Sequence, residues 1–89
     1  MANIAQQKKR NRRSIKQHER NLRYRSTIKT LFRRVDDALA RDDRETVEAR
    51  SRELEKLIDR AAAEGVIHRN NAARKKSRVA RLTQRVPTP

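Results

Sequence analysis

Cationic side chains have the clearest capacity for chemistry in this chain of 89 amino acids. Between positions 8 and 16, six of nine residues are basic and none is acidic: Lys8, Lys9, Arg10, Arg12, Arg13 and Lys16. Like charges repel along a free helix, so this segment needs an anionic partner to make helix its preferred state. The chain has eighteen Arg to seven Lys, and the planar guanidinium binds phosphate through two parallel hydrogen bonds. A GC-rich genome, which favours Arg codons, would produce the same excess.

The charge is divided unevenly along the chain. Residues 1–34 hold twelve Lys or Arg and the single acid Glu19, a net charge of +11. Residues 35–64 hold six bases and ten acids, a net charge of −4, and residues 65–89 hold seven bases and no acid. Two cationic segments therefore bracket an ordinary one. Nucleic acid is the expected partner, because each neutralised phosphate releases counterions and adds affinity that does not depend on base sequence.

Residues suited to catalysis or metal binding are few. Cys is absent, there is one Gly, and His18 and His68 lie fifty positions apart in no metal-ligand spacing. His18 fits a solvent-facing or phosphate-contacting role, and His68 fits a helix cap or a packing residue. The carboxylates have the spacing of surface ion pairs, such as Asp37 with Arg41 and Glu48 with Arg52. The sequence predicts no enzyme, no metal site and no cofactor.

Helical periodicity dominates the elements that must position the cations, and strand patterns are missing. A first helix is predicted over residues 4–40. Its apolar residues recur at steps of three and four, with Leu22 and Ile15 extending the stripe thinly: Tyr24, Ile28, Leu31, Phe32, Val35, Ala38 and Leu39. A second helix is predicted over residues 44–64, started by a capping box from Asp42 to Glu45 and ended by Gly65. Its apolar face comprises Val47, Leu54, Leu57, Ile58, Ala61 and Ala62.

A third helix is predicted over residues 69–85, with Ala72, Ala73, Val79, Ala80 and Leu82 on its apolar face. Short loops require antiparallel neighbours, so the expected fold is all-α, a three-helix hairpin bundle whose long basic first helix partly overhangs. Residues 1–86 are expected to form one domain, with 87–89 a disordered tail. Residues 1–20 are too polar for a secretory signal, and no apolar run reaches transmembrane length.

Helix lengths predict how the cations are arranged. At 1.5 Å per residue the first helix spans about 55 Å and the second about 32 Å, so the second covers only the C-terminal half of the first. The third helix then starts beside the middle of the first and runs parallel to it. Arg20, Arg23, Arg74 and Lys76 are expected to form one patch, with the acidic segment 36–64 pointing away from it.

The two aromatic residues indicate which kind of nucleic acid is bound. Single-strand binders stack bases on aromatic rings, but Tyr24 and Phe32 lie on the apolar stripe and are expected in the core. Base stacking is therefore not the main expected mode. Folded, double-helical RNA or DNA recognised through shape and phosphate spacing is more consistent with the sequence.

Several stretches resemble the S-twenty family of the bacterial small ribosomal subunit. They are the opening Met1 to Ile4, Lys8 to Arg10, Arg20-Asn21 with Ser26 and Lys29-Thr30, and above all the run from Gly65 to Arg78, GVIHRNNAARKKSR. The similarity fails only at the tail from Arg85. Gln6, Gln7 and Ile15 depart from the family's usual residues. Ile15 stands where the family usually has a polar residue.

The resemblance implies a three-helix protein that binds 16S ribosomal RNA directly, contacting the 5′ domain and the long penultimate stem. It implies a structural role in small-subunit assembly without catalysis, few protein contacts, and a cytoplasmic location in the ribosome. The candidate RNA-binding residues are Lys8, Lys9, Arg10, Arg12, Arg13, Lys16, Arg20, Asn21, Arg23, Arg25, Ser26, Lys29, His68, Arg69, Asn70, Arg74, Lys75, Lys76, Ser77, Arg78 and Arg81.

Two other classes of function share the positive charge. An architectural protein for double-stranded DNA would need groove-wedging residues or a compact recognition helix, and the predicted helices are too long for a helix-turn-helix. A membrane-surface helix would need a broad apolar face through residues 5–20, where Ile15 is the only large apolar residue.

Overall fold

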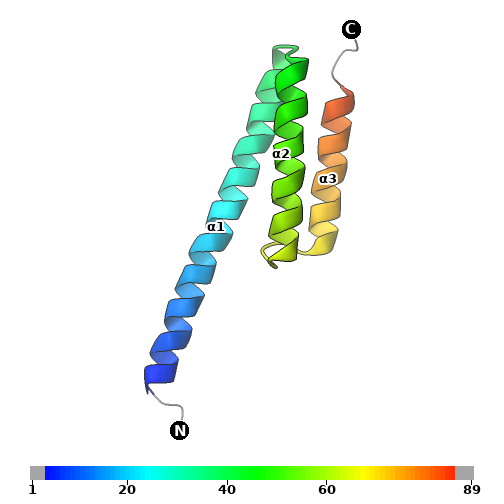
Figure 1. Ribbon diagram of the computed structural model, residues 1–89. Helices are drawn as coiled ribbons and strands as arrows, with labels where there is room; N and C mark the ends of the chain where they lie inside the picture. Colours follow the sequence, from blue (N-terminus) through cyan, green and yellow to red (C-terminus); the bar gives the residue numbers. More distant parts are fainter. Residues whose placement is uncertain (1–3, 86–89) are drawn as a thin grey trace.

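Three helices make up the computed structural model, which describes residues 4–85 (Figure 1). They are α1 (Ile4–Ala40), α2 (Arg44–Ala63) and α3 (Arg69–Gln84). The predicted all-α class and the long first helix are confirmed, and the ends of α2 and α3 fall one residue before the expected ones. The predicted tail 87–89 lies outside the described residues. Figure 1 shows α2 antiparallel to the C-terminal half of α1, and α3 beside α2 with its start level with the middle of α1.

The core lies where the three helices overlap. On α1 the buried residues are Ile28, Leu31, Phe32, Val35 and Ala38, with Tyr24 and Leu39 partly buried against them. The predicted extension of this stripe through Leu22 and Ile15 is wrong, because these side chains are 51% and 58% exposed. At about 100° per residue they lie on nearly the opposite side of the helix from Val35, so no bundle partner can reach them.

The other two helices contribute narrower apolar stripes. Val47, Leu54, Ile58 and Ala61 of α2 are buried, and Leu57 and Ala62 pack against them partly exposed. On α3 the buried residues are Ala72, Val79 and Leu82. The predicted core positions Ala73 and Ala80 are exposed, because each follows a buried residue and is turned about 100° further round the helix.

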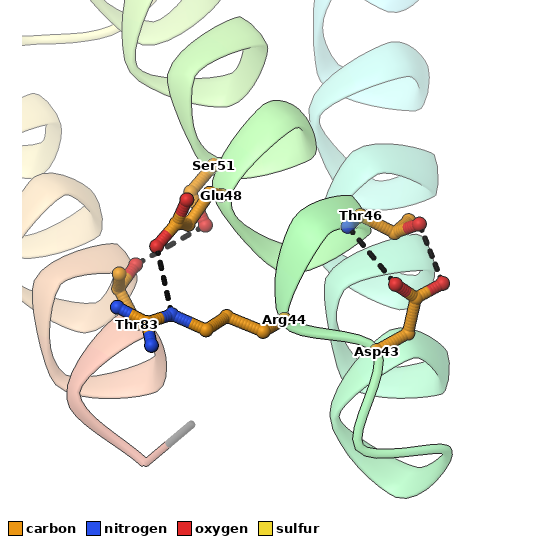
Figure 2. A network of polar contacts seen from close by, with 6 residues as sticks. All are labelled: Asp43, Arg44, Thr46, Glu48, Ser51 and Thr83. Carbon is orange, nitrogen blue, oxygen red and sulfur yellow. Dashed lines mark hydrogen bonds and ion pairs between the residues drawn. The ribbon is translucent and has the colours of Figure 1, made fainter. Parts of the chain in front are cut away.

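The α1–α2 turn depends on Asp42 and Asp43, in roles that differ from those predicted. Asp42 has φ 52° and is the left-handed residue that ends α1, where the Asp43 N–H donates to the Ala38 carbonyl at 2.9 Å. The N-cap of α2 is Asp43, whose carboxylate accepts bonds from the Thr46 N–H at 3.2 Å and the Thr46 hydroxyl at 2.6 Å (Figure 2). The N-cap is therefore one residue later than predicted, and its carboxylate bonds Thr46, so the predicted capping box from Asp42 to Glu45 does not form.

The α2–α3 turn is a Schellman motif. Gly65 has φ 74°, its N–H donates to the Ala62 carbonyl, and the Val66 N–H donates to the Ala61 carbonyl at 2.9 Å. The buried Val66 and Ala61 side chains close the motif. The predicted role of Gly65 as the left-handed residue is confirmed. The turn carries Ile67 into the core and reverses the chain, so that α3 runs beside α2 (Figure 1).

Near the N-terminus of α2, polar side chains form contacts within α2 and between α2 and α3. Arg44 pairs with Glu48 at 3.2 Å, and the Thr83 hydroxyl donates a hydrogen bond to the hydroxyl of the buried Ser51 (Figure 2). Glu48 therefore pairs with Arg44 and not, as predicted, with Arg52. Across residues 4–85 the other ion pairs are Arg50–Glu53 and Lys76–Asp59, so the predicted Asp37–Arg41 pair is also absent.

Candidate nucleic-acid interface

The overhang, defined here as residues 4–19 of α1, is exposed throughout and extends beyond the other helices (Figure 1). Lys9, Arg12, Arg13 and Lys16 line one shallow hollow on its surface, and Arg13 and Lys16 share the next with Arg20. These side chains form one basic stripe because their spacing returns them to the same face of the helix. Arg10 is about 100° from Lys9, so it projects from a different side. The cationic run predicted from sequence is thus divided between faces.

Arg20, a predicted RNA-binding residue, makes a structural contact where the C-terminus of α2 lies against α1. A guanidinium nitrogen of Arg20 donates to the Glu64 carbonyl at 3.3 Å, which satisfies a free carbonyl at the C-terminus of α2. A hydrogen bond with Glu64 raises the pKa of Tyr24 above its ordinary value of 10.0. The acidic segment therefore does not point wholly away from the cations, as predicted, since Glu64 touches two residues of α1.

Two polar atoms at this junction have no partner among the described residues. They are Nε of Arg20 and Oδ1 of Asn21, both buried from solvent. Buried polar atoms are nearly always hydrogen-bonded in folded proteins. Arg20 Nε can therefore still donate a hydrogen bond and Asn21 Oδ1 can still accept one, and both belong to predicted RNA-binding residues.

A groove of about 450 Å³ separates α1 from α3. Its walls carry five cations: Arg25, Lys29 and Arg33 from α1, and Lys75 and Arg78 from α3. Ile28, Phe32 and Ile67 form an apolar floor, and Asp36 is the single acid in the lining. The tertiary structure thus brings two predicted site residues of α1, Arg25 and Lys29, close to two of α3, Lys75 and Arg78, which lie about fifty positions later in the sequence.

Arg33 and Arg78 show what the groove adds to the sequence reasoning. Arg33 was not predicted as a site residue, but it lies on the α1 wall of the groove with Arg25 and Lys29. The Arg78 guanidinium carbon lies 4.4 Å from the centre of the Phe32 ring, a cation–π contact that orders the guanidinium over the groove floor. Phe32 is therefore a core residue, as predicted, that also supports a cation facing the groove.

The outer face of α3 carries a second row of exposed polar residues. Asn70, Arg74, Ser77 and Arg81 recur at steps of four, three and four, and all are exposed. His68 is the N-cap of this helix, since its Nδ1 accepts the Asn70 N–H at 3.1 Å. The predicted capping role of His68 is confirmed.

The remaining candidates are dispersed. Lys76 pairs with Asp59 of α2 at 3.1 Å, so the predicted patch of Arg20, Arg23, Arg74 and Lys76 does not form as one set of free cations. Lys8, Arg23 and Ser26 are exposed on α1, and Arg69 is exposed at the start of α3.

Within residues 4–85 no group of three or more His, Asp or Glu side chains is placed to hold a metal ion. None of the three helices, over the range that the structure describes, is long and apolar enough to cross a membrane. The concentrated chemistry of the described surface is cationic.

The sequence is similar to those of known proteins. Residues 2–84 match the pattern of the family described as Ribosomal protein S20. The chain is 42% identical over 81 residues to the small ribosomal subunit protein bS20 of Anaeromyxobacter dehalogenans, covering 91% of this chain and 88% of that protein. It is 44% identical over 79 residues to the bS20 of Nitrosomonas eutropha, covering 89% and 91%. With the run from Gly65 to Arg78 and the three-helix fold, these matches show that the chain belongs to the Ribosomal protein S20 family.

Proposed function

We propose that this protein is a structural constituent of the small ribosomal subunit that binds folded 16S ribosomal RNA and stabilises it during assembly, without catalysing a reaction. Residues 1–86 act as one RNA-binding unit in the cytoplasm, within the ribosome. The observation that carries the proposal is the basic stripe of Lys9, Arg12, Arg13 and Lys16 on a helix that extends beyond its own bundle. A helix with this charge that extends beyond the other two helices is stabilised by phosphate on its surface.

Two further surfaces support the same function. The groove between α1 and α3 and the outer row of α3 present cations on adjacent faces of a slender molecule, whose extents are 67 × 21 × 13 Å. A slender protein with cations on several sides fits between RNA segments better than on the side of one duplex. Asn70 and Ser77, interspersed with the cations of the outer row, can hydrogen-bond phosphate or ribose 2′-OH groups.

Salt dependence tests the proposal. If about eight to twelve cations neutralise phosphates, log K against log[salt] has a slope of about −6 to −11. The assay titrates the purified protein against a 16S rRNA transcript at several salt concentrations. A slope shallower than about −3 would show that the basic surfaces mostly face solvent.

The choice of ligand separates this function from the alternatives. We expect the protein to bind the rRNA transcript more tightly than a double-stranded DNA of equal phosphate content or vesicles of anionic lipid, all at one salt concentration. In cell extracts it should copurify with ribosomes in high-magnesium buffer and be released by RNase but not by DNase or detergent. Preference for DNA would favour the architectural alternative and contradict the proposal.

A further inference from the structure

The acid in the groove between α1 and α3 has no protein partner. Asp36 is exposed and lines the groove with five cations, yet it forms no ion pair or hydrogen bond with any residue from 4 to 85. An ionised carboxylate only accepts hydrogen bonds and repels phosphate. In a groove that binds an anionic ligand, Asp36 weakens the attraction unless the ligand also brings hydrogen-bond donors to it.

The rest of the groove has the features of a nucleotide site. Lys29, Arg33 and Asp36 lie at steps of four and three on one face of α1, so the backbone positions of Lys29 and Asp36 are about 10 Å apart along the helix axis. This spacing is comparable to the length of a mononucleotide from phosphate to base edge. Between them, the Arg78 guanidinium lies on the Phe32 ring, and planar guanidinium groups are surfaces on which bases stack. A volume of about 450 Å³ accommodates one nucleotide.

We propose that this groove binds one guanine nucleotide, with its phosphate at Lys29 and Lys75, its base on Arg78, and its Watson–Crick edge at Asp36. Guanine is selected because its N1–H and N2–H groups both donate to one carboxylate. Adenine presents an unprotonated N1 to the same carboxylate, and hypoxanthine lacks the N2 donor. The inference rests on the proposed RNA-binding function, and the ligand is either an unstacked guanosine of the RNA or a free guanine nucleotide.

Titration of the full chain with GMP, IMP and AMP, followed by NMR shifts of Phe32 and Ile67, tests the selectivity. The three ligands carry the same phosphate charge, so general attraction to a chain of net charge +14 cancels from the comparison. We expect GMP to bind about tenfold more tightly than IMP for the one charged hydrogen bond lost, and AMP to bind more weakly still. Equal affinities for the three nucleotides would overturn the inference.

Asp36→Asn and Asp37→Asn form a matched pair of variants. Each removes one negative charge from an exposed position on α1, but Asp37 lines a different hollow with Arg34 and Arg41. Charge alone predicts that both variants bind every nucleotide slightly more tightly. We expect Asp37→Asn to do so, and Asp36→Asn to lose about tenfold in GMP affinity together with the preference over IMP. An Asp36→Asn variant that binds GMP as tightly as Asp37→Asn would refute the role of the carboxylate.

Binding to the 16S rRNA transcript distinguishes the two sources of guanine. If Asp36→Asn weakens RNA binding relative to Asp37→Asn, and GMP competes with the RNA, the ligand is an unstacked guanosine of the RNA. If the two variants bind RNA equally while GMP selectivity holds, the groove takes a free guanine nucleotide. A wild-type chain that does not bind the transcript contradicts the proposed function, whereas loss of nucleotide selectivity with RNA binding intact contradicts this inference alone.

Discussion

Replacing Lys29 and Lys75 together by Ala removes one cation from each wall of the groove between α1 and α3. A charged hydrogen bond to phosphate contributes about 1.5–3 kcal/mol, so two such contacts correspond to about 3–6 kcal/mol. This is a loss of about 10²- to 10⁴-fold in affinity for 16S rRNA. Neither lysine belongs to the buried core, so the bundle should keep its helicity.

The matched control is the double variant Arg44→Ala with Arg50→Ala. It removes the same charge, but these residues are paired on α2 with Glu48 and Glu53. Exposed ion pairs contribute about 0–1 kcal/mol to stability, and the control should lose well under 1 kcal/mol of RNA affinity.

The assay is fluorescence anisotropy with a labelled 16S rRNA transcript at one magnesium and salt concentration, with helicity checked by circular dichroism. A salt series gives a second readout, because losing two phosphate contacts makes the slope of log K against log[salt] shallower by about 1.4–1.8. The control should keep the wild-type slope. Equal losses in the two variants would mean that net charge decides affinity and that the groove makes no local contacts with RNA.

The other predictions concern the fold. Leu54→Ala, at a fully buried position, should reduce the free energy of unfolding by about 2–5 kcal/mol in urea titrations, whereas Leu22→Ala on the exposed face should have little effect. Gly65→Ala should cost about 1–2 kcal/mol in the same titrations through left-handed strain alone, since a Cβ there meets no atom within 4 Å; an unchanged stability would contradict the Schellman assignment. Hydrogen bonds from Thr46 lower the pKa of Asp43 below its ordinary value of 3.8. The stability that these bonds provide is complete above pH 3.8 and is lost as the pH falls through the pKa of the folded state. Asp43→Ala should therefore flatten this part of the curve of unfolding free energy against pH. Without RNA, amide exchange should be fast across residues 8–20 and slow across the helical hairpin, and strong protection in the first segment would contradict the coupling of this helix to RNA.

Local and periodic signals in the sequence were enough to predict the helices and most of the core. Steps of three and four place Ile28, Leu31 and Val35 on one face of a helix whatever surrounds it. Gly65 marks the second turn because left-handed backbone is favourable for glycine. The turn between Asp42 and Asp43 was misassigned by one residue, because either aspartate can cap and only the path of the chain selects one.

Tertiary packing decided which cations are free and which chemistry they surround. Arg20 and Lys76 look like any other cations in the sequence, but folding places them against the Glu64 carbonyl and Asp59. Arg33 and Asp36 were not predicted as site residues from the sequence, but packing of α3 near α1 makes them part of the lining of a groove. The physical reason is range: helix formation and charge density depend on residues within a few positions, whereas a groove depends on the length of α2 and on the turn at Gly65, which together set where α3 meets α1.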